Sequence, residues 1–114
     1  DIMRDRGALG REVPGGLIEN VYRIQLINMT EEPLDLEITA QGKDLENVHV
    51  RAGDSDSAVV KVAPFANEWV PLVIQVPLGE VKPGLYDLQL KAQTLESEEL
   101  DLKAEEKTSF FVPN

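Results

Sequence analysis

Side chains that could carry catalytic chemistry are few and scattered along this 114-residue chain. It has one histidine, His49, and no cysteine. Nucleophilic catalysis needs a nucleophile beside a base that a third group orients, and a single histidine without cysteine cannot form a Cys–His relay. The hydroxyl groups do not lie in a recognisable nucleophile turn; they belong to Ser55, Ser57, Ser97 and Ser109. The chain is therefore predicted not to be an enzyme.

His49 is expected on the polar face of a short strand, because it alternates with Val48 and Val50. Outward strand positions are usually solvated, so a surface residue is the favoured interpretation. A weak metal contact and a pH-sensitive interface are the alternatives.

Carboxylates are the main candidate metal ligands. Asp54 and Asp56 open a segment that resembles the start of a calcium loop. The sixth position of such a loop requires glycine and the twelfth a bidentate glutamate, and here they are Val59 and Phe65. This segment is therefore interpreted as a polar turn.

A second group of carboxylates lies near the C-terminal end, and within it Glu98 and Glu99 are weak binding candidates. Hard cations prefer carboxylate oxygens, so calcium is one alternative. Runs of like charge are usually solvated loops that self-repulsion holds open, which is the favoured interpretation. The group comprises Glu96, Glu98, Glu99, Asp101, Glu105 and Glu106.

Copper would require clustered Cys or Met for Cu(I), or several His for Cu(II). Met3 and Met29 are far apart in the chain, and His49 is alone. No metal site and no cofactor is predicted in this domain.

Trp69 is the residue with binding character, because its register places it on the outward face of a strand. An exposed Trp can anchor a protein partner. The favoured interpretation is that a neighbouring loop covers it. Separately, Asn28-Met29-Thr30 matches the N-glycosylation pattern, which arises often by chance.

Charge and composition restrict the function classes. The net charge of −10 argues against nucleic acid, which needs a Lys/Arg surplus, and against docking on an anionic membrane face through the domain body. It favours solubility and basic partners. An apolar content of 42% is that of a globular domain, and only 5% aromatic residues means that the core must be aliphatic.

Strict alternation of apolar and polar residues dominates residues 17–29, with Tyr22, Ile24 and Leu26 on one face. This period of two predicts a half-buried β-strand. Further alternating segments follow at roughly ten-residue spacing with turn residues between them. Pro71 lies inside one of them, which predicts an edge strand or a bulge there. The remaining segments are 34–40, 48–52, 58–62, 69–77, 86–92 and 108–112.

About seven short strands without a convincing helix predict an all-β, immunoglobulin- or fibronectin-like two-sheet sandwich of antiparallel strands. Tyr86 lies early in the penultimate strand, where such sandwiches place a tyrosine corner; a core aromatic with its hydroxyl at the rim is the alternative. Asn20 faces the core, and its amide is expected to hold the turn at residues 13–16. With Glu19 pairing to Arg6 or Arg11, this polar group would fix the angle between the preceding segment and the sandwich. Asn20, Tyr22 and Tyr86 are thus the predicted structural residues.

The stretch Gly16–Asn28, GLIENVYRIQLIN, is more specific than any composition argument. It resembles the C-terminal domain of the FixG/CcoG family, accessory proteins for assembly of cbb3-type cytochrome c oxidase. Shorter matches support the resemblance and lie at Arg4-Asp5-Arg6-Gly7, Arg11-Glu12, Lys82-Pro83-Gly84 and Glu106-Lys107-Thr108-Ser109-Phe110. Residues 40–80 match only as a generic sandwich.

The resemblance implies a larger membrane protein with several transmembrane helices and a ferredoxin-like part holding two [4Fe-4S] clusters. It places an immunoglobulin-like domain last, on the periplasmic face of the bacterial inner membrane, and it implies copper handling by the parent, which reduces Cu(II). The parent is thus expected to be an iron–sulfur oxidoreductase. Because this chain has no cysteine, the clusters belong to the other part, and no functional residue carries over.

Residues 1–16 are accordingly expected to be a linker that follows a membrane segment outside this sequence, with at most a short strand near 8–13. Residues 17–114 are expected to form the sandwich. The first functional hypothesis is a non-catalytic domain whose edge strands and acidic face contact oxidase-assembly components, a copper chaperone or a second copy. A metal-buffering module and a stand-alone adhesion or carbohydrate-binding sandwich, with Trp69 as a stacking platform, are the alternatives.

Overall fold

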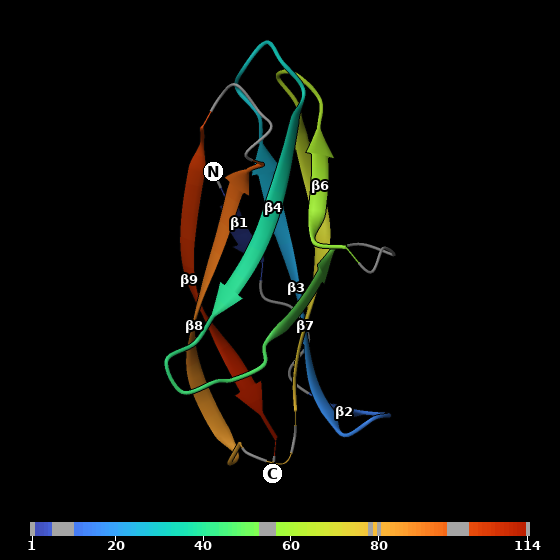
Figure 1. Ribbon diagram of the computed structural model, residues 1–114, viewed down its shortest axis with the longest axis vertical. Coiled ribbons are helices and arrows are strands. Elements are labelled where there is room, and N and C mark those ends of the chain that lie inside the picture. Colours follow the sequence, from blue (N-terminus) through green and yellow to red (C-terminus); the bar gives the residue numbers. More distant parts are fainter. Residues whose placement is uncertain are drawn as a thin grey trace.

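Nine β-strands account for most of the part of the chain that the computed structural model describes, namely residues 2–5, 11–52, 57–77, 79, 81–95 and 101–113. For residues 2–5 only the backbone is described. The strands form two antiparallel sheets that face each other (Figure 1). They are β1 (Ile2–Asp5), β2 (Arg11–Val13), β3 (Leu17–Ile27), β4 (Leu34–Gln41), β5 (His49–Ala52), β6 (Val59–Val62), β7 (Asn67–Pro77), β8 (Gly84–Thr94) and β9 (Lys103–Val112).

The five-stranded sheet has the order β1-β3-β7-β5, and β2 also pairs with β3. The four-stranded sheet has the order β6-β4-β8-β9. Strands β3 and β7 pair along their whole length, from Leu17 opposite Pro77 to Ile27 opposite Asn67. The predicted all-β, immunoglobulin-like sandwich is thus confirmed, and its seven predicted strands correspond to β3–β9.

The segment expected to be a linker differs from that expectation. β1 pairs with β3 from Ile2 opposite Leu26 to Asp5 opposite Arg23, and β2 pairs with β3 from Arg11 opposite Glu19 to Val13 opposite Leu17. Residues 2–5 and 11–13 therefore belong to the sheet. The short strand that the sequence allowed near residues 8–13 corresponds to β2, whereas β1 was not predicted, because an edge strand needs only backbone groups to pair with a long neighbour.

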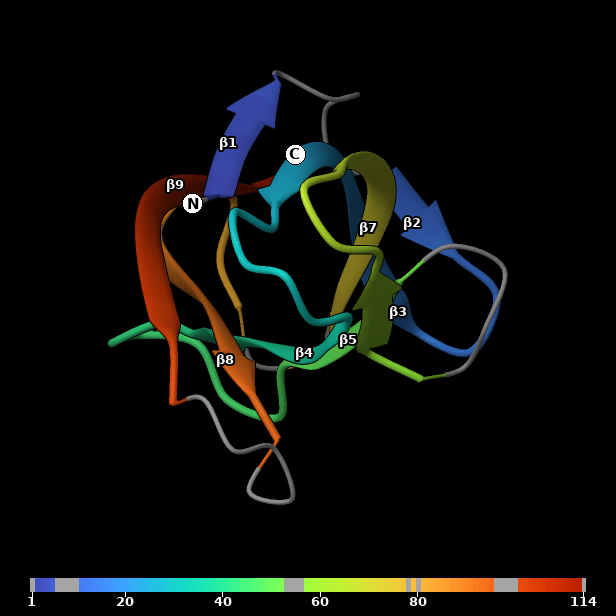
Figure 2. The same cartoon turned by 90° about the horizontal axis from the view of Figure 1, so that it is seen from above.

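The core lies between the sheets and is aliphatic, as composition requires. Tyr22, Ile24 and Leu26 of β3 are at most 4% exposed, as the alternation predicted. Seen along the long axis, the two sheets enclose this core, and β1 lies beside β9 (Figure 2). The largest fully buried side chains are Phe110, Ile18, Ile24, Leu26, Ile38, Leu72, Ile74, Leu88, Leu90, Val62, Val76 and Val112.

Pro71 lies in β7, which is interior by sheet order, between β3 and β5. The described pairs between β5 and β7 run from Gln75 to Leu72, the residue after Pro71, and the residue that would face Pro71 from β5 lies outside the described part of the chain. Proline has no N–H to donate to a neighbouring strand. The molecule is elongated, 46 by 23 by 23 Å, so its two ends are far apart.

Candidate protein-contact surface

Trp69 and Arg23 form a cation–π pair on the outer face of the five-stranded sheet. The guanidinium carbon of Arg23 lies 4.7 Å from the centroid of the Trp69 ring. The two residues come from neighbouring strands and are diagonal in register, since Trp69 is opposite Gln25 and Arg23 is opposite Pro71. Trp69 is 45% exposed, so the expectation that a loop covers it is wrong. An exposed Trp beside Arg is the side-chain chemistry most frequent in protein-binding hot spots.

Glu19, on the same face, is a buried carboxylate held by two donors. Gln75 Nε2 donates to its Oε2 at 2.9 Å, and Arg11 Nη2 donates to its Oε1 at 3.2 Å. The hydrogen bond from Gln75 and the nearby positive charge of Arg11 lower the pKa of Glu19 below its usual 4.5, although burial opposes them. The predicted Glu19–Arg11 pair is thus present, whereas the alternative partner Arg6 lies outside the described residues.

Arginine is frequent among the described side chains of this face. They include Arg11, Arg23 and Arg51, and the one carboxylate described among them is that of Glu19; Asp5 is opposite Arg23 in register, but only its backbone is described. His49 is exposed on the same face, as predicted, opposite Gln75. The described side chains of this candidate contact face are therefore mostly basic and aromatic, whereas the hypothesis from the sequence was a contact through an acidic face.

Asn20 and Tyr22 bind the five-stranded sheet to the backbone of β9 in the other sheet. Asn20 donates through Nδ2 to the carbonyl of Phe111 and accepts the Phe111 N–H at Oδ1, both at 2.9 Å. The Tyr22 hydroxyl donates to the carbonyl of Ser109 at 2.6 Å. The Asn20 amide thus pairs with β9 and not with the turn at residues 13–16, so the expected partner was wrong and the group joins the two sheets.

Tyr86 has the hydrogen bonds of a tyrosine corner. Its hydroxyl donates to the carbonyl of Lys82 at 2.6 Å and accepts the Lys82 N–H at 3.1 Å. The ring therefore ties the turn before β8 to the strand itself.

Asn28 holds together two turns at one end of the sandwich. Its Nδ2 donates to the carbonyls of Glu32, Val62 and Ala63 at 2.8–3.1 Å, and its Oδ1 accepts from the N–H and hydroxyl of Thr30. The residue is 1% exposed. A glycan would replace one of the two N–H groups of this amide and has no room at a nitrogen of a residue that is 1% exposed, so the Asn28-Met29-Thr30 pattern is structural in this fold.

Two surface hollows lie at opposite ends of the sandwich. A hollow of about 300 Å³ beside Met29 is lined largely by apolar side chains, including Leu26, Leu34 and Leu36. A larger and more polar one of about 560 Å³ is lined by Lys43, Asp44, Glu46, Asn47, Pro77, Gly79 and Val81.

The metal-ligand candidates do not form a described site. Glu98 and Glu99, with Asp54 and Asp56, lie outside the described residues. Among the residues that are described, no group of three or more His, Asp or Glu side chains is placed to hold a metal ion. No described helix is long and apolar enough to cross a membrane.

The sequence did not reveal that Arg23 stacks on Trp69 or that buried Asn28 joins two turns. The alternation of residues 17–29 leaves Arg23 on the outward face, but only the pairing of β3 with β7 sets it beside Trp69. Asn28 drew notice for its tripeptide pattern alone. A buried Asn at the end of an alternating strand, followed by a turn, is a signal that its amide serves the turn.

Fold and contact surface together define an immunoglobulin-like β-sandwich with an exposed Arg–Trp face. The family model described as "IG-like fold at C-terminal of FixG, putative oxidoreductase" matches residues 1–113. The chain belongs to this family of FixG C-terminal domains. The resemblance carried by residues 16–28 is thereby confirmed.

Solved structures show the same fold. A FixG-related protein from Vibrio parahaemolyticus is similar with a TM-score of 0.70 and 21% identity, over 97% of this chain and 92% of that one. A family 123 glycoside hydrolase from Clostridium perfringens is similar with a TM-score of 0.51 and 13% identity, over 86% of this chain but 21% of the hydrolase. No curated protein sequence matches.

Proposed function

We propose that this domain is a non-catalytic protein-contact module of a FixG-type membrane protein that assists cbb3-type cytochrome c oxidase assembly and copper handling. Family membership supports the placement in a FixG parent. In this proposal the parent's other part carries the two [4Fe-4S] clusters and reduces copper, and this domain binds oxidase-assembly components or a second copy on the periplasmic side.

The Arg23–Trp69 pair is the observation that carries the contact role. Trp and Arg dominate binding hot spots because they combine a large apolar area with directed polar groups. Half-buried Val21 and Val73 lie on the same outer face, between this pair and the Glu19 group, and extend the apolar area. The three arginines of the face favour an acidic partner surface.

The test uses the full-length parent with Arg23→Ala and Trp69→Ala together. We expect cbb3 oxidase activity and oxidase copper content in isolated membranes to fall at least about tenfold, since truncated hot-spot residues cost about 2 kcal/mol or more each. The matched control is Leu85→Ala with Lys107→Ala on the outer face of the four-stranded sheet, which also removes one apolar group and one charge. Unchanged oxidase activity at normal parent abundance would refute the contact role.

The periplasmic location is tested separately. Alkaline phosphatase, which requires the oxidising periplasm to form its disulfides, is fused to the parent directly after the residue that corresponds to Pro113 of this chain. High phosphatase activity is expected, and an inactive fusion at full abundance would place the domain in the cytoplasm.

A further inference from the structure

Three large apolar side chains are exposed at one end of the sandwich. Met29 in the β3–β4 turn is 77% exposed, Phe65 in the β6–β7 turn is 69% exposed, and Leu102 before β9 is 40% exposed. Figure 1 shows both turns at the same end of the molecule, beyond β4 and β6. Single exposed apolar residues are common, but a group at one end marks a binding surface more often. We call Met29, Phe65 and Leu102 the apolar tip.

The apolar hollow of about 300 Å³ opens beside Met29 and Leu102. Its wall is formed by side chains from both sheets, including Leu26 and Leu36 with Ala92 and Ala104. This volume is at the lower limit for small-molecule sites, which range over about 300–1,000 Å³. A hollow of this size suits one or two apolar side chains of a partner.

The tip is preorganised by Asn28. Its amide bonds the carbonyls of Glu32 and Ala63, one from each turn, at 2.8 and 3.1 Å. The Phe65 N–H donates to the carbonyl of Thr30 at 3.2 Å, which joins the turns a second time. Phe65 has a φ of 50°, a conformation that costs a non-glycine residue about 1–2 kcal/mol. A rigid surface loses less conformational entropy on binding than a mobile one.

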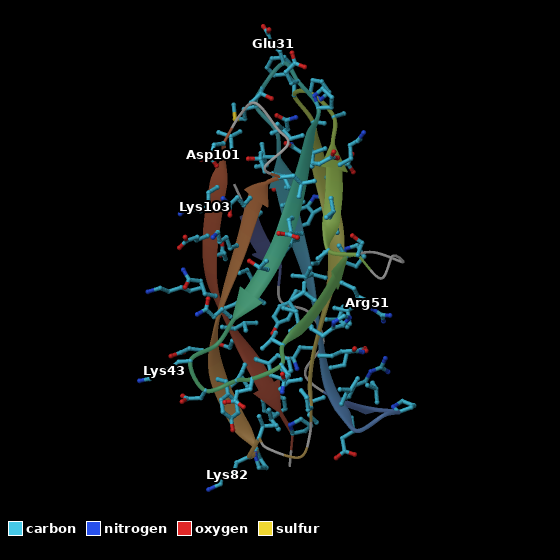
Figure 3. All side chains as sticks on the ribbon, in the orientation of Figure 1. Glu31, Lys43, Arg51, Lys82, Asp101 and Lys103 are labelled. Atoms are coloured by element: carbon cyan, nitrogen blue, oxygen red, sulfur yellow. The ribbon has the colours of Figure 1, made fainter. Side chains whose placement is uncertain are left out.

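An acidic rim surrounds the apolar tip. Glu31 and Glu32 belong to the same turn as Met29, Asp101 precedes Leu102, and Glu68 is opposite Leu26 of the hollow. All four are exposed, and the described lining of the hollow includes one basic residue, Lys103, which pairs with Glu105 at 3.8 Å. Glu31 and Asp101 lie toward the same end of the molecule, whereas Lys82 lies at the other (Figure 3). Such a rim repels an anionic membrane surface and attracts Lys and Arg.

We propose that the apolar tip is a docking site for an extended basic segment of a protein partner. One apolar anchor of that segment enters the hollow, and flanking Lys or Arg side chains meet the acidic rim. This surface is separate from the Arg23–Trp69 face, which selects acidic partners. The domain thus offers two contact sites of opposite charge preference, and the second goes beyond the proposed function.

The experiment places a photo-reactive amino acid at position 29 of the full-length parent in its native membranes. The matched control places it at Leu85, which is 71% exposed at the far end of β8. After irradiation the attached molecule is identified by mass spectrometry down to the linked peptide. We expect an adduct from position 29 only, joined to a protein segment with an apolar residue flanked by Lys or Arg.

Charge reversal supplies the second arm. Glu31→Lys with Glu32→Lys is expected to lower the adduct yield about tenfold, because like charges then face the partner. Glu37→Lys with Asp87→Lys, which changes the net charge equally on the outer face of the four-stranded sheet, is expected to leave the yield unchanged. Thermal unfolding of each variant confirms that the domain remains folded.

Several outcomes would overturn the proposal: no adduct, a lipid adduct, an adduct with a second copy, or a yield insensitive to Glu31 and Glu32. Each of these leaves the Arg23–Trp69 test standing, because that test reads oxidase activity from a different face. If the Arg23→Ala/Trp69→Ala parent lost oxidase activity but position 29 gave no adduct, only the docking proposal for the apolar tip would be refuted.

Discussion

At the scale of single residues, the buried polar side chains of Asn20 and Tyr22 in β3 join the two sheets through hydrogen bonds to β9. The side-chain amide of Asn20 forms the same pair of hydrogen bonds that a backbone amide of a neighbouring strand would form. It donates to the carbonyl of Phe111 and accepts from the Phe111 N–H. An amide is the one neutral side-chain group that both donates and accepts in this geometry.

Asn20→Ala is expected to lower the free energy of unfolding by about 2–4 kcal/mol, because two partly buried backbone groups of Phe111 lose their partner. Urea unfolding of the isolated chain followed by fluorescence measures this. Asn67→Ala, at an exposed position at the start of β7, is the control and is expected to change stability by less than about 0.5 kcal/mol. Equal stability of the two variants would show that the Asn20 pair contributes nothing.

Glu19→Gln tests the lowered pKa of Glu19. A carboxyl whose pKa is lower when folded than when unfolded stabilises the fold above its unfolded pKa, and this stability is lost as pH falls through the folded value. We therefore expect wild type to be more stable than the variant at pH 7, and the difference to shrink as pH falls below 4.5. Paired unfolding curves at several pH values provide the measurement. A difference that does not depend on pH would contradict the assignment.

At the scale of elements, β8 and β9 are the long hairpin on which the four-stranded sheet depends, and they pair from Gly84 opposite Val112 to Gln93 opposite Lys103. Tyr86 fixes where β8 begins, since its hydroxyl makes both hydrogen bonds to Lys82. The corner thus joins a local turn to the strand that follows it.

Tyr86→Phe removes only the hydroxyl and is expected to cost about 1 kcal/mol, because the Lys82 groups are exposed and can bond to water instead. Differential scanning calorimetry should show a fall in Tm of a few degrees, about 4–8 °C per kcal/mol for a domain of this size. An unchanged Tm would mean that the corner is present but contributes no stability.

At the scale of the whole molecule, β1 and β2 close the five-stranded sheet along β3. Without them the outer backbone groups of β3 would be an open edge, which is a template for pairing with another chain. Residues 2–5 and 11–13 are therefore expected to act as part of the sandwich.

A chain beginning at Arg11, which lacks β1, is expected to lose about 3 kcal/mol of stability with the four residue pairs to β3, and to self-associate through the open edge. Light scattering and chemical unfolding test both effects. If the shortened chain were monomeric and as stable as the full one, residues 2–5 would be a linker in practice.

The sequence alone predicted seven strands, the inward set of β3 and the aliphatic core. These depend on the two-residue period of a strand, which is a local property that each segment displays by itself. The family resemblance was equally local, since it rested on consecutive residues 16–28. What the alternation could not show was the strand at residues 2–5, because edge pairing uses backbone groups that every sequence has.

Only the tertiary structure decided which side chains meet. Asn20 and Phe111 are 91 positions apart, and Arg23 reaches Trp69 only because β3 and β7 pair in one register. A shift of that register by one residue would turn Trp69 into the core, so the contact face depends on long-range pairing. The apolar tip likewise exists because Asn28 joins two turns that strands β4, β5 and β6 separate along the chain. The two-residue alternation of a strand can be detected from neighbouring residues, whereas the candidate contact surfaces consist of residues that are far apart in the chain and meet only in the folded protein.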